Sequence, residues 1–199
     1  MRSSLIILAF FLSGLLLAYG VDFDGWTAVA DYTIYALYVL LFLVGVGVGS
    51  SQDALAVLRR VNWKIILVPL AIVLGTMLGV GLVSLALSGV SLREGLAVGA
   101  GFGYYSLSSI VISQLHSEQL GVVALLANVL REMLTLLLTP LMVRYFGKLA
   151  PIAAGGATAM DTTLPIITRF TGSEYAVIAV FSGLVLTVLV PFLVTLILQ

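Results

Sequence analysis

Long apolar runs separated by short polar loops make up most of the chain. Because a helix rises about 1.5 Å per residue, roughly 20 apolar residues are needed to cross a bilayer. The segments with this character are 3–19, 32–49, 65–88, 92–115, 118–146, 150–171 and 174–198. The pattern therefore predicts an all-α polytopic membrane protein, with residues 1–199 forming a single transmembrane domain.

Polar residues between these runs predict where two of the helices begin. Ser91 and Glu94 have the spacing of a capping box, which indicates a helix from residue 92. Ser117 is suited to cap the segment 118–146.

The basic residues predict the orientation, because Lys and Arg collect in cytoplasmic loops. Arg59, Arg60 and Lys64 place the loop after the second segment inside, and the N-terminus with it. We interpret the first segment as a retained helix and not as a signal peptide, since another membrane segment follows it closely.

Segments 92–115 and 150–171 differ from the others because their centres are rich in glycine and hydroxyl residues. If both cross the membrane, five of the eight Lys and Arg residues outside the segments lie inside the cell; if both are re-entrant, seven do. We therefore expect five transmembrane helices plus two broken or re-entrant segments, with the N-terminus in and the C-terminus out. Seven full spans is the alternative.

Composition narrows the possible functions. The chain is 61% hydrophobic and 9% charged, and its nine basic and nine acidic residues cancel, which leaves no basic patch for nucleic acid. With no cysteine and only one histidine, His116, we expect no metal or other cofactor. We also do not expect an enzyme: an aspartyl membrane protease needs two catalytic aspartates, and a serine hydrolase needs a base near its serine.

Three charged residues, Arg131, Glu132 and Asp161, are predicted near membrane depth, where ionisable groups are costly and usually functional. The first two share a helix face with the polar residues Asn128, Thr135 and Thr139. One interpretation is that Arg131 pairs with Glu132 while Asn128 joins helices. The favoured one gives each charge a different partner, because adjacent helical residues point about 100° apart.

The stretch GGATAMDTTLP at 155–165 predicts two half-helices that meet at Asp161. Paired glycines weaken a helix, Asp161 or Thr163 can cap a new one, and Pro165 suits its first turn. The alternative is a proline kink in which Asp161 is only a cap. Broken backbone at membrane depth is tolerated where it lines a cavity or is buried in protein.

The stretch GFGYYSLSS at 101–109 predicts a second break. It is not a dinucleotide-binding loop, because Ser106 occupies the last glycine position and no strand flanks it. Two broken segments that meet near the midplane are typical of secondary transporters with inverted repeats, although no sequence repeat is visible here.

Three blocks resemble the lysine exporters of the LysO type: GFGYYSLSS at 101–109, NVLRE at 128–132 and GGATAMDTTLP at 155–165. The resemblance covers essentially the whole chain. It implies export of L-lysine, and of its analogue thialysine, across the cytoplasmic membrane, driven by proton antiport with Asp161 as the buried acid. The departures from the family pattern are Tyr104, Ser109 and Ala159.

Full-length members of this family carry an additional N-terminal membrane region. The resemblance therefore implies that the short chain is completed by association into a homodimer or by a small N-terminal partner subunit.

We expect Arg131 and half-helix N-termini to hold the lysine carboxylate, while Asp161 and Glu132 bind ammonium groups or exchange them for protons. The alternatives are export of another cationic amino acid or cation, or a transport subunit that requires a separate partner chain. The candidate substrate-binding or proton-coupling residues are Asp161, Glu132, Arg131, Asn128, Thr158, Thr162, Thr163, Gly103, Tyr104, Tyr105, Ser106 and Ser108.

Overall fold

The computed structural model describes residues 63–86 and 89–199, together with isolated helical positions between residues 13 and 46. The chain divides into two compact units, Met1–Phe42 and Leu43–Gln199, and the fold below is that of the second unit. Apart from those isolated positions, the membrane segments predicted at 3–19 and 32–49 lie outside the described residues, as does the basic pair Arg59 and Arg60.

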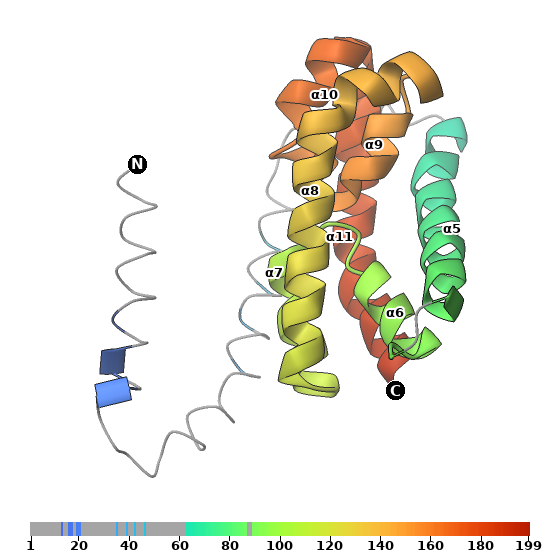
Figure 1. The fold of residues 1–199 in the computed structure, drawn as a ribbon. Coiled ribbons are helices and arrows are strands. Elements are labelled where there is room, and N and C mark those ends of the chain that lie inside the picture. The colour runs from blue at the N-terminus through green and yellow to red at the C-terminus, as the bar shows by residue number, and fades with distance from the viewer. Residues whose placement is uncertain are drawn as a thin grey trace. The chain divides into compact units, whose positions relative to one another are not determined.

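Three long helices form the frame of the second unit (Figure 1). They are α5 (Trp63–Ala86), α8 (Glu118–Phe146) and α11 (Ala176–Leu198). Each contains a stretch long and apolar enough to cross a membrane. They confirm the segments predicted at 65–88, 118–146 and 174–198, and Ser117 caps α8 as expected, its Oγ accepting a hydrogen bond from the backbone N–H of Leu120 at 3.2 Å.

The other two segments are broken near their centres, as predicted. The first consists of α6 (Leu92–Gly99) and α7 (Tyr105–Leu115). The second consists of α9 (Ala150–Gly155), the 3₁₀ turn η1 (Gly156–Met160) and α10 (Leu164–Thr171). A further 3₁₀ turn, η2 (Ser173–Tyr175), leads into α11.

Each broken segment starts and ends at the same end of the bundle. Figure 1 shows α6 rising from the end where α8 begins and α7 returning there, while α9 and α10 do the same from the opposite end. Side-chain interactions at the two ends agree with this path. Arg93 Nε donates to the carbonyl of Ile197 at the first end, and Lys148 Nζ lies 3.5 Å from Glu174 Oε1 at the second. Each broken segment is therefore a helical hairpin, the shape expected of a re-entrant segment; the number of membrane spans and the orientation stay predictions.

The α6 helix begins at the predicted capping box. Glu94 N–H donates to Ser91 Oγ at 3.2 Å, and Ser91 N–H donates to Glu94 Oε2 at 2.8 Å. These contacts with Ser91, reinforced by His116 Nε2 at 3.0 Å from Glu94 Oε1, lower the pKa of Glu94 to about 2. The box thereby ties the start of α6 to the turn between α7 and α8.

Helix α8 places polar residues on its buried side and large apolar residues on its exposed side, the reverse of helices in water-soluble proteins. On α8 the buried side includes Asn128, Thr135 and Thr139. Its exposed side carries large apolar residues, among them Leu126, Leu130 and Leu137. A lipid environment tolerates this pattern, since no free energy is lost by exposing leucine to acyl chains.

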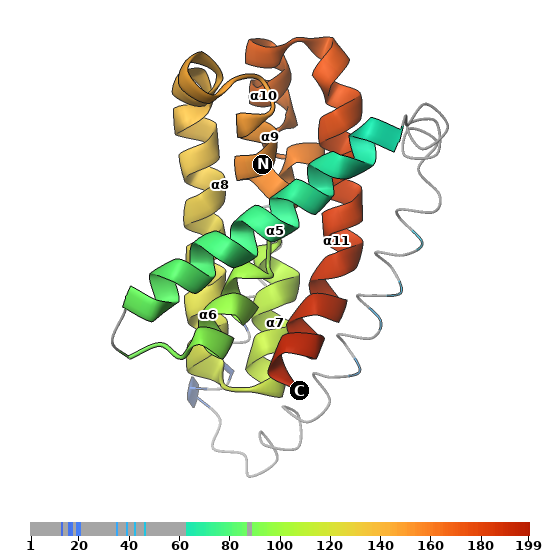
Figure 2. The same ribbon diagram turned by 90° about the vertical axis from the view of Figure 1, so that its right-hand side faces the viewer.

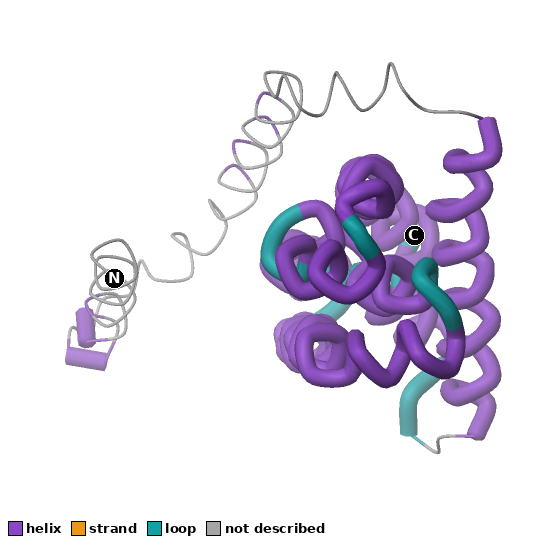
Figure 3. The backbone as a smooth tube through the Cα atoms, turned by 90° about the horizontal axis from the view of Figure 1, so that it is seen from above, coloured by secondary structure: helices purple, strands orange, loops and turns teal. Residues whose placement is uncertain are grey.

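The α11 helix is the most enclosed of the three long helices. Its buried residues occur on more than one face and include Phe181, Leu186, Val190 and Val194. Figure 2 shows α5 crossing obliquely in front of the broken segments, and Figure 3 shows α5 along one side of the other helices. Helix α11 therefore provides the inner wall against which both broken segments pack.

Candidate functional site

The two broken segments contact each other backbone to backbone where their helices are interrupted. The first break lies between α6 and α7, and the second begins where α9 ends. Ala157 N–H in η1 donates a hydrogen bond to the carbonyl of Phe102 in the first break at 2.8 Å. Gly156 has a φ of 62°, and a Cβ at this position would collide with the Phe102 carbonyl oxygen. Gly103 has a φ of 94°, and a Cβ there would lie 2.8 Å from the Gly155 carbonyl oxygen. The glycines are required because only glycine permits both these backbone angles and this close approach.

Asn128 on α8 holds the first break in place. Its Oδ1 accepts a hydrogen bond from Gly103 N–H at 2.7 Å, and its Nδ2 donates to the carbonyls of Ala124 at 2.9 Å and Val98 at 3.3 Å. The side chain is 3% exposed. Asn128 thus satisfies backbone groups that a broken helix leaves without partners.

Arg131 on α8 holds the second break in the same way. Its Nε donates to the carbonyl of Ala154 at 2.8 Å and its Nη2 to that of Ala153 at 3.0 Å, which caps the C-terminus of α9. No ion pair joins it to Glu132 within the described residues, so the two neighbouring charges have different surroundings; a separate partner for each charge stays a prediction. Two of its five N–H donors thus bind the backbone, and the expectation that Arg131 holds a substrate carboxylate stays a prediction.

Hydroxyl groups donate hydrogen bonds to further backbone carbonyls around the breaks. Ser108 Oγ donates to the carbonyl of Tyr104 at 2.9 Å, and Thr158 Oγ1 donates to that of Gly155 at 3.0 Å. Thr163 precedes α10, but its hydroxyl donates back to the carbonyl of Thr158 at 3.0 Å and does not cap the helix. These side chains shape the site and do not face its cavity, with the exception of Thr158.

A cavity of about 110 Å³ lies where the breaks meet. It is lined by residues of all three sequence blocks and of α11, namely Gly103, Tyr104, Tyr105, Ser106, Glu132, Ala157, Thr158, Met160, Asp161, Thr162 and Thr187. Eight of the twelve candidate residues are among them, whereas Arg131, Asn128, Thr163 and Ser108 are not. Among the described residues the lining includes two carboxylates and no basic side chain, which suits a cationic group.

Asp161 lies in the turn between η1 and α10. Its Oδ1 accepts hydrogen bonds from Thr162 N–H at 2.6 Å and Thr162 Oγ1 at 3.3 Å. Both residues are exposed, so the expectation of a buried acid is corrected for the described part of the chain. The reason is that this short polar turn buries Thr163 and directs its other two side chains outward.

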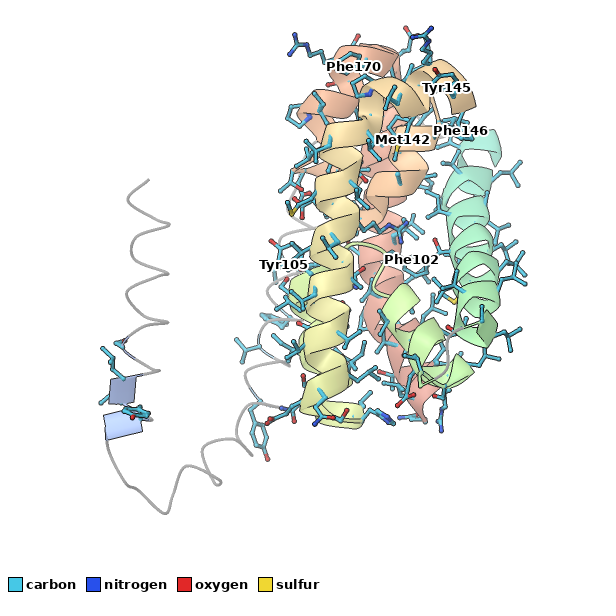
Figure 4. The ribbon with its side chains drawn as sticks, in the orientation of Figure 1. Phe102, Tyr105, Met142, Tyr145, Phe146 and Phe170 are labelled. Atoms are coloured by element: carbon cyan, nitrogen blue, oxygen red, sulfur yellow. The ribbon has the colours of Figure 1, made fainter. Side chains whose placement is uncertain are left out.

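The N-terminus of α7 also borders the cavity. The helix begins at Tyr105 with no side-chain cap, and Tyr105 and Ser106 of its first turn are lining residues. Figure 4 places Phe102 and Tyr105 near the middle of the bundle, away from Tyr145, Phe146 and Phe170 at one end. The partial positive charge of a helix N-terminus therefore meets the two carboxylates in one cavity.

Sequence reasoning missed three lining residues, Ala157, Met160 and Thr187. Ala157 and Met160 lie within the block at 155–165, whose polar side chains were candidates, and its turn past the cavity brings them to the lining. Thr187 lies in α11, outside all three blocks, and the signal that points to it is a single hydroxyl in an apolar run.

Comparison with known proteins places the chain in a family. A sequence model described as "Lysine exporter LysO" matches residues 8–198. The chain is 34% identical over 160 residues to a Haemophilus influenzae protein named "Putative lysine exporter", with 80% of each chain covered. It is 31% identical over 160 residues to "Lysine exporter LysO" of Escherichia coli, with 80% of this chain covered.

The chain spans about half of the Escherichia coli relative, 52% of which is covered. No solved structure matches. The chain belongs to the LysO family of lysine exporters.

Proposed function

We propose that this chain is a secondary active exporter that moves L-lysine across the cytoplasmic membrane in exchange for protons or another coupling ion. The observation that carries the proposal is the acidic cavity at the crossing of two re-entrant segments. Secondary transporters bind substrates at such broken helices, where backbone and half-helix ends supply polar groups. Family membership supports lysine as the substrate.

The cavity matches the chemistry of lysine at both ends. Asp161 and Glu132 attract an ammonium group, and the rings of Tyr104 and Tyr105 add a further surface that favours cations. The lysine carboxylate goes to the N-terminus of α7, the role first expected of Arg131.

The size of the cavity implies that transport involves a rearrangement. At about 110 Å³ it is smaller than the roughly 300–1,000 Å³ typical of small-molecule sites. In this form it accommodates only one end of the substrate at a time, and both ends bind together once the site enlarges as the broken segments shift against α11. Such a shift first changes the hydrogen bond between Ala157 N–H and the Phe102 carbonyl.

The charged ends of the bundle support an orientation. Arg144, Lys148 and Arg169 lie in the part of the chain around the second re-entrant segment, close to the end where α8 stops. We assign this end to the cytoplasm on the positive-inside rule, which puts the C-terminus outside.

A homodimer, or a small partner subunit that supplies further membrane helices, completes the transporter. Thialysine, with the same charged groups, shares the route.

The proposal is tested by lysine flux in liposomes that contain the purified full chain. Asp161→Asn keeps the side-chain shape but removes the negative charge that attracts the ammonium group. A charged hydrogen bond contributes about 1.5–3 kcal/mol, so we expect lysine flux to fall at least about tenfold. Glu174→Gln is the matched control, because it makes the same chemical change at an exposed acid outside the cavity.

Counterflow of labelled lysine against arginine, ornithine and sodium then separates the substrate classes. Exchange with lysine alone supports the proposal, whereas equal exchange with sodium indicates a cation antiporter. Lysine flux that is unchanged in Asp161→Asn removes this carboxylate from the mechanism. No flux from the wild-type chain, restored by a partner subunit, indicates a transport subunit.

A further inference from the structure

Thr187 contributes a hydroxyl to the cavity from a helix that carries none of the recognised motifs. The side chain is 3% exposed and lines the cavity, yet its Oγ1 has no hydrogen-bond partner among the described residues. Buried polar groups in proteins are nearly always satisfied, so this one requires an explanation.

The other threonines in helices of this protein show what is unusual about Thr187. Helical threonines commonly donate to the carbonyl one turn earlier. Thr135 does so to Arg131, Thr139 to Thr135 and Thr171 to Ile167, with distances of 2.6–2.9 Å. Thr187 makes no such bond. Rotation among the staggered χ1 positions suffices to present its hydroxyl to the cavity.

The position of Thr187 is determined by the contact between α11 and η1. Gly183, one helical turn earlier on the same face, lies so close to η1 that a Cβ there would be 2.8 Å from the Ala157 carbonyl and 2.7 Å from Met160 Cβ. This contact holds the α11 backbone against the second break. Thr187 therefore lines the cavity from the face of α11 that packs against η1.

We propose that Thr187, Asp161 and Glu132 form a seat for a primary ammonium group, with one acceptor from each of three structural elements. A primary ammonium has three N–H donors, and each of these side chains offers an oxygen that accepts. Glu132 makes no hydrogen bond or ion pair within the described residues, so its carboxylate is open to such a contact. The seat deepens the proposed function by selecting the unsubstituted ammonium of a substrate, and it rests on that function only for the identity of lysine.

The test compares variants of the full chain, purified in detergent and in liposomes. Thr187→Val removes the hydroxyl at nearly constant shape, Thr187→Ser keeps it, and Ser182→Ala is the matched control. Ser182 is likewise a buried α11 hydroxyl without a partner among the described residues, but it does not line the cavity. The measurements are the KM for lysine and the thermal midpoint with and without L-lysine, Nε-trimethyl-L-lysine or methylammonium.

We expect Thr187→Val to weaken lysine binding about tenfold, the loss typical of one hydrogen bond to a charged group, while Thr187→Ser and Ser182→Ala bind as the wild type does. The thermal midpoint without ligand does not fall in Thr187→Val, because the variant removes an unsatisfied group. Nε-trimethyl-L-lysine, which has no N–H at that end, binds the wild type weakly and is not weakened further by the substitution.

Three results overturn the seat: equal lysine binding by Thr187→Val and the wild type, equal losses for lysine and its trimethylated form, or a lower midpoint of Thr187→Val without ligand. If Thr187→Val and the wild type bind lysine equally while the wild type still transports lysine, only the seat is refuted and the proposed function is retained. Conversely, stabilisation by methylammonium that depends on Thr187, in a chain that moves no lysine with or without a partner subunit, supports the seat and refutes lysine export.

Discussion

At the scale of single residues, two side chains on one face of α8 perform the same task at two breaks. Asn128 binds backbone groups around Gly103, and Arg131 binds the last carbonyls of α9. Unpaired backbone groups are expensive at membrane depth, because lipid offers no hydrogen bonds. The peptide carbonyls that Arg131 satisfies therefore account for a charged guanidinium inside the bundle.

The assignment of Arg131 as a positioning residue predicts the effect of Arg131→Lys. Lysine keeps the positive charge but lacks the planar fork that reaches two carbonyls at once. We expect the variant to be less stable by about 1–3 kcal/mol, while the KM for lysine changes little at temperatures where the protein is folded. Thermal unfolding in detergent and lysine flux measure the two effects.

Arg144→Lys is the control for this prediction, since Arg144 lies on the same helix but is exposed, with its guanidinium 5.5 Å from the ring centre of Tyr145. It is expected to leave both quantities near their wild-type values. Unchanged stability of Arg131→Lys together with a raised KM would instead make Arg131 a substrate-binding residue.

At the scale of elements, the decisive feature is how closely two helix breaks approach. The bond from Ala157 N–H to the Phe102 carbonyl joins residues 55 positions apart, and it forms only because no side chain stands between the backbones. Phe102 itself adopts a φ of 44°, which non-glycine residues rarely do. The crossing therefore combines local strain with the absence of side chains, as functional sites often do.

Gly156→Ala tests this close approach. The added Cβ meets the Phe102 carbonyl oxygen and the backbone angles disfavour alanine, so we expect a loss of at least about 2 kcal/mol of stability and a matching loss of lysine flux. Gly79→Ala is the control, because no described residue lies within 4 Å of its added Cβ. Within α5 that change is expected to stabilise the helix by about 0.5–1 kcal/mol. Equal thermal midpoints for Gly156→Ala and Gly79→Ala would contradict the close backbone approach between Gly156 and Phe102.

At the scale of the whole molecule, the described fold is three long helices that enclose two hairpins inserted from opposite ends. The hairpin made by α6 and α7 returns to the end that carries His116, and the hairpin made by α9 and α10 returns to the end that carries Lys148. Under the proposed function, each hairpin is expected to act as a gate, and opening one of them is expected to connect the cavity with one side of the membrane.

Cysteine labelling tests the insertion of both hairpins, and the natural chain has no cysteine to interfere. His116→Cys is expected to react with a membrane-impermeant maleimide from outside intact cells. Lys148→Cys and Arg169→Cys are expected to react only after permeabilisation, because positive residues remain inside. Labelling of Lys148→Cys from outside would reverse the assignment of that end to the cytoplasm.

Local signals in the sequence were sufficient for much of the fold. The capping box at Ser91, the cap at Ser117 and the length of the apolar runs determine where helices begin and end, and all three act over a few residues. The glycine pairs and Pro165 likewise determine the breaks, because backbone freedom and a missing N–H are properties of single residues. The sequence by itself therefore determined the long helices, the positions of the breaks and the acids near them.

Only the tertiary structure decided which polar groups face the cavity. It turned Arg131 and Asn128 toward backbone carbonyls and amides, left Asp161 exposed, and brought Thr187 to the site from a helix without a motif. These outcomes depend on which buried donors and acceptors meet across distant segments, and each must find a partner once lipid and packing exclude water. A one-dimensional pattern records that a polar residue lies near membrane depth, whereas its partner is determined by the approach of another helix.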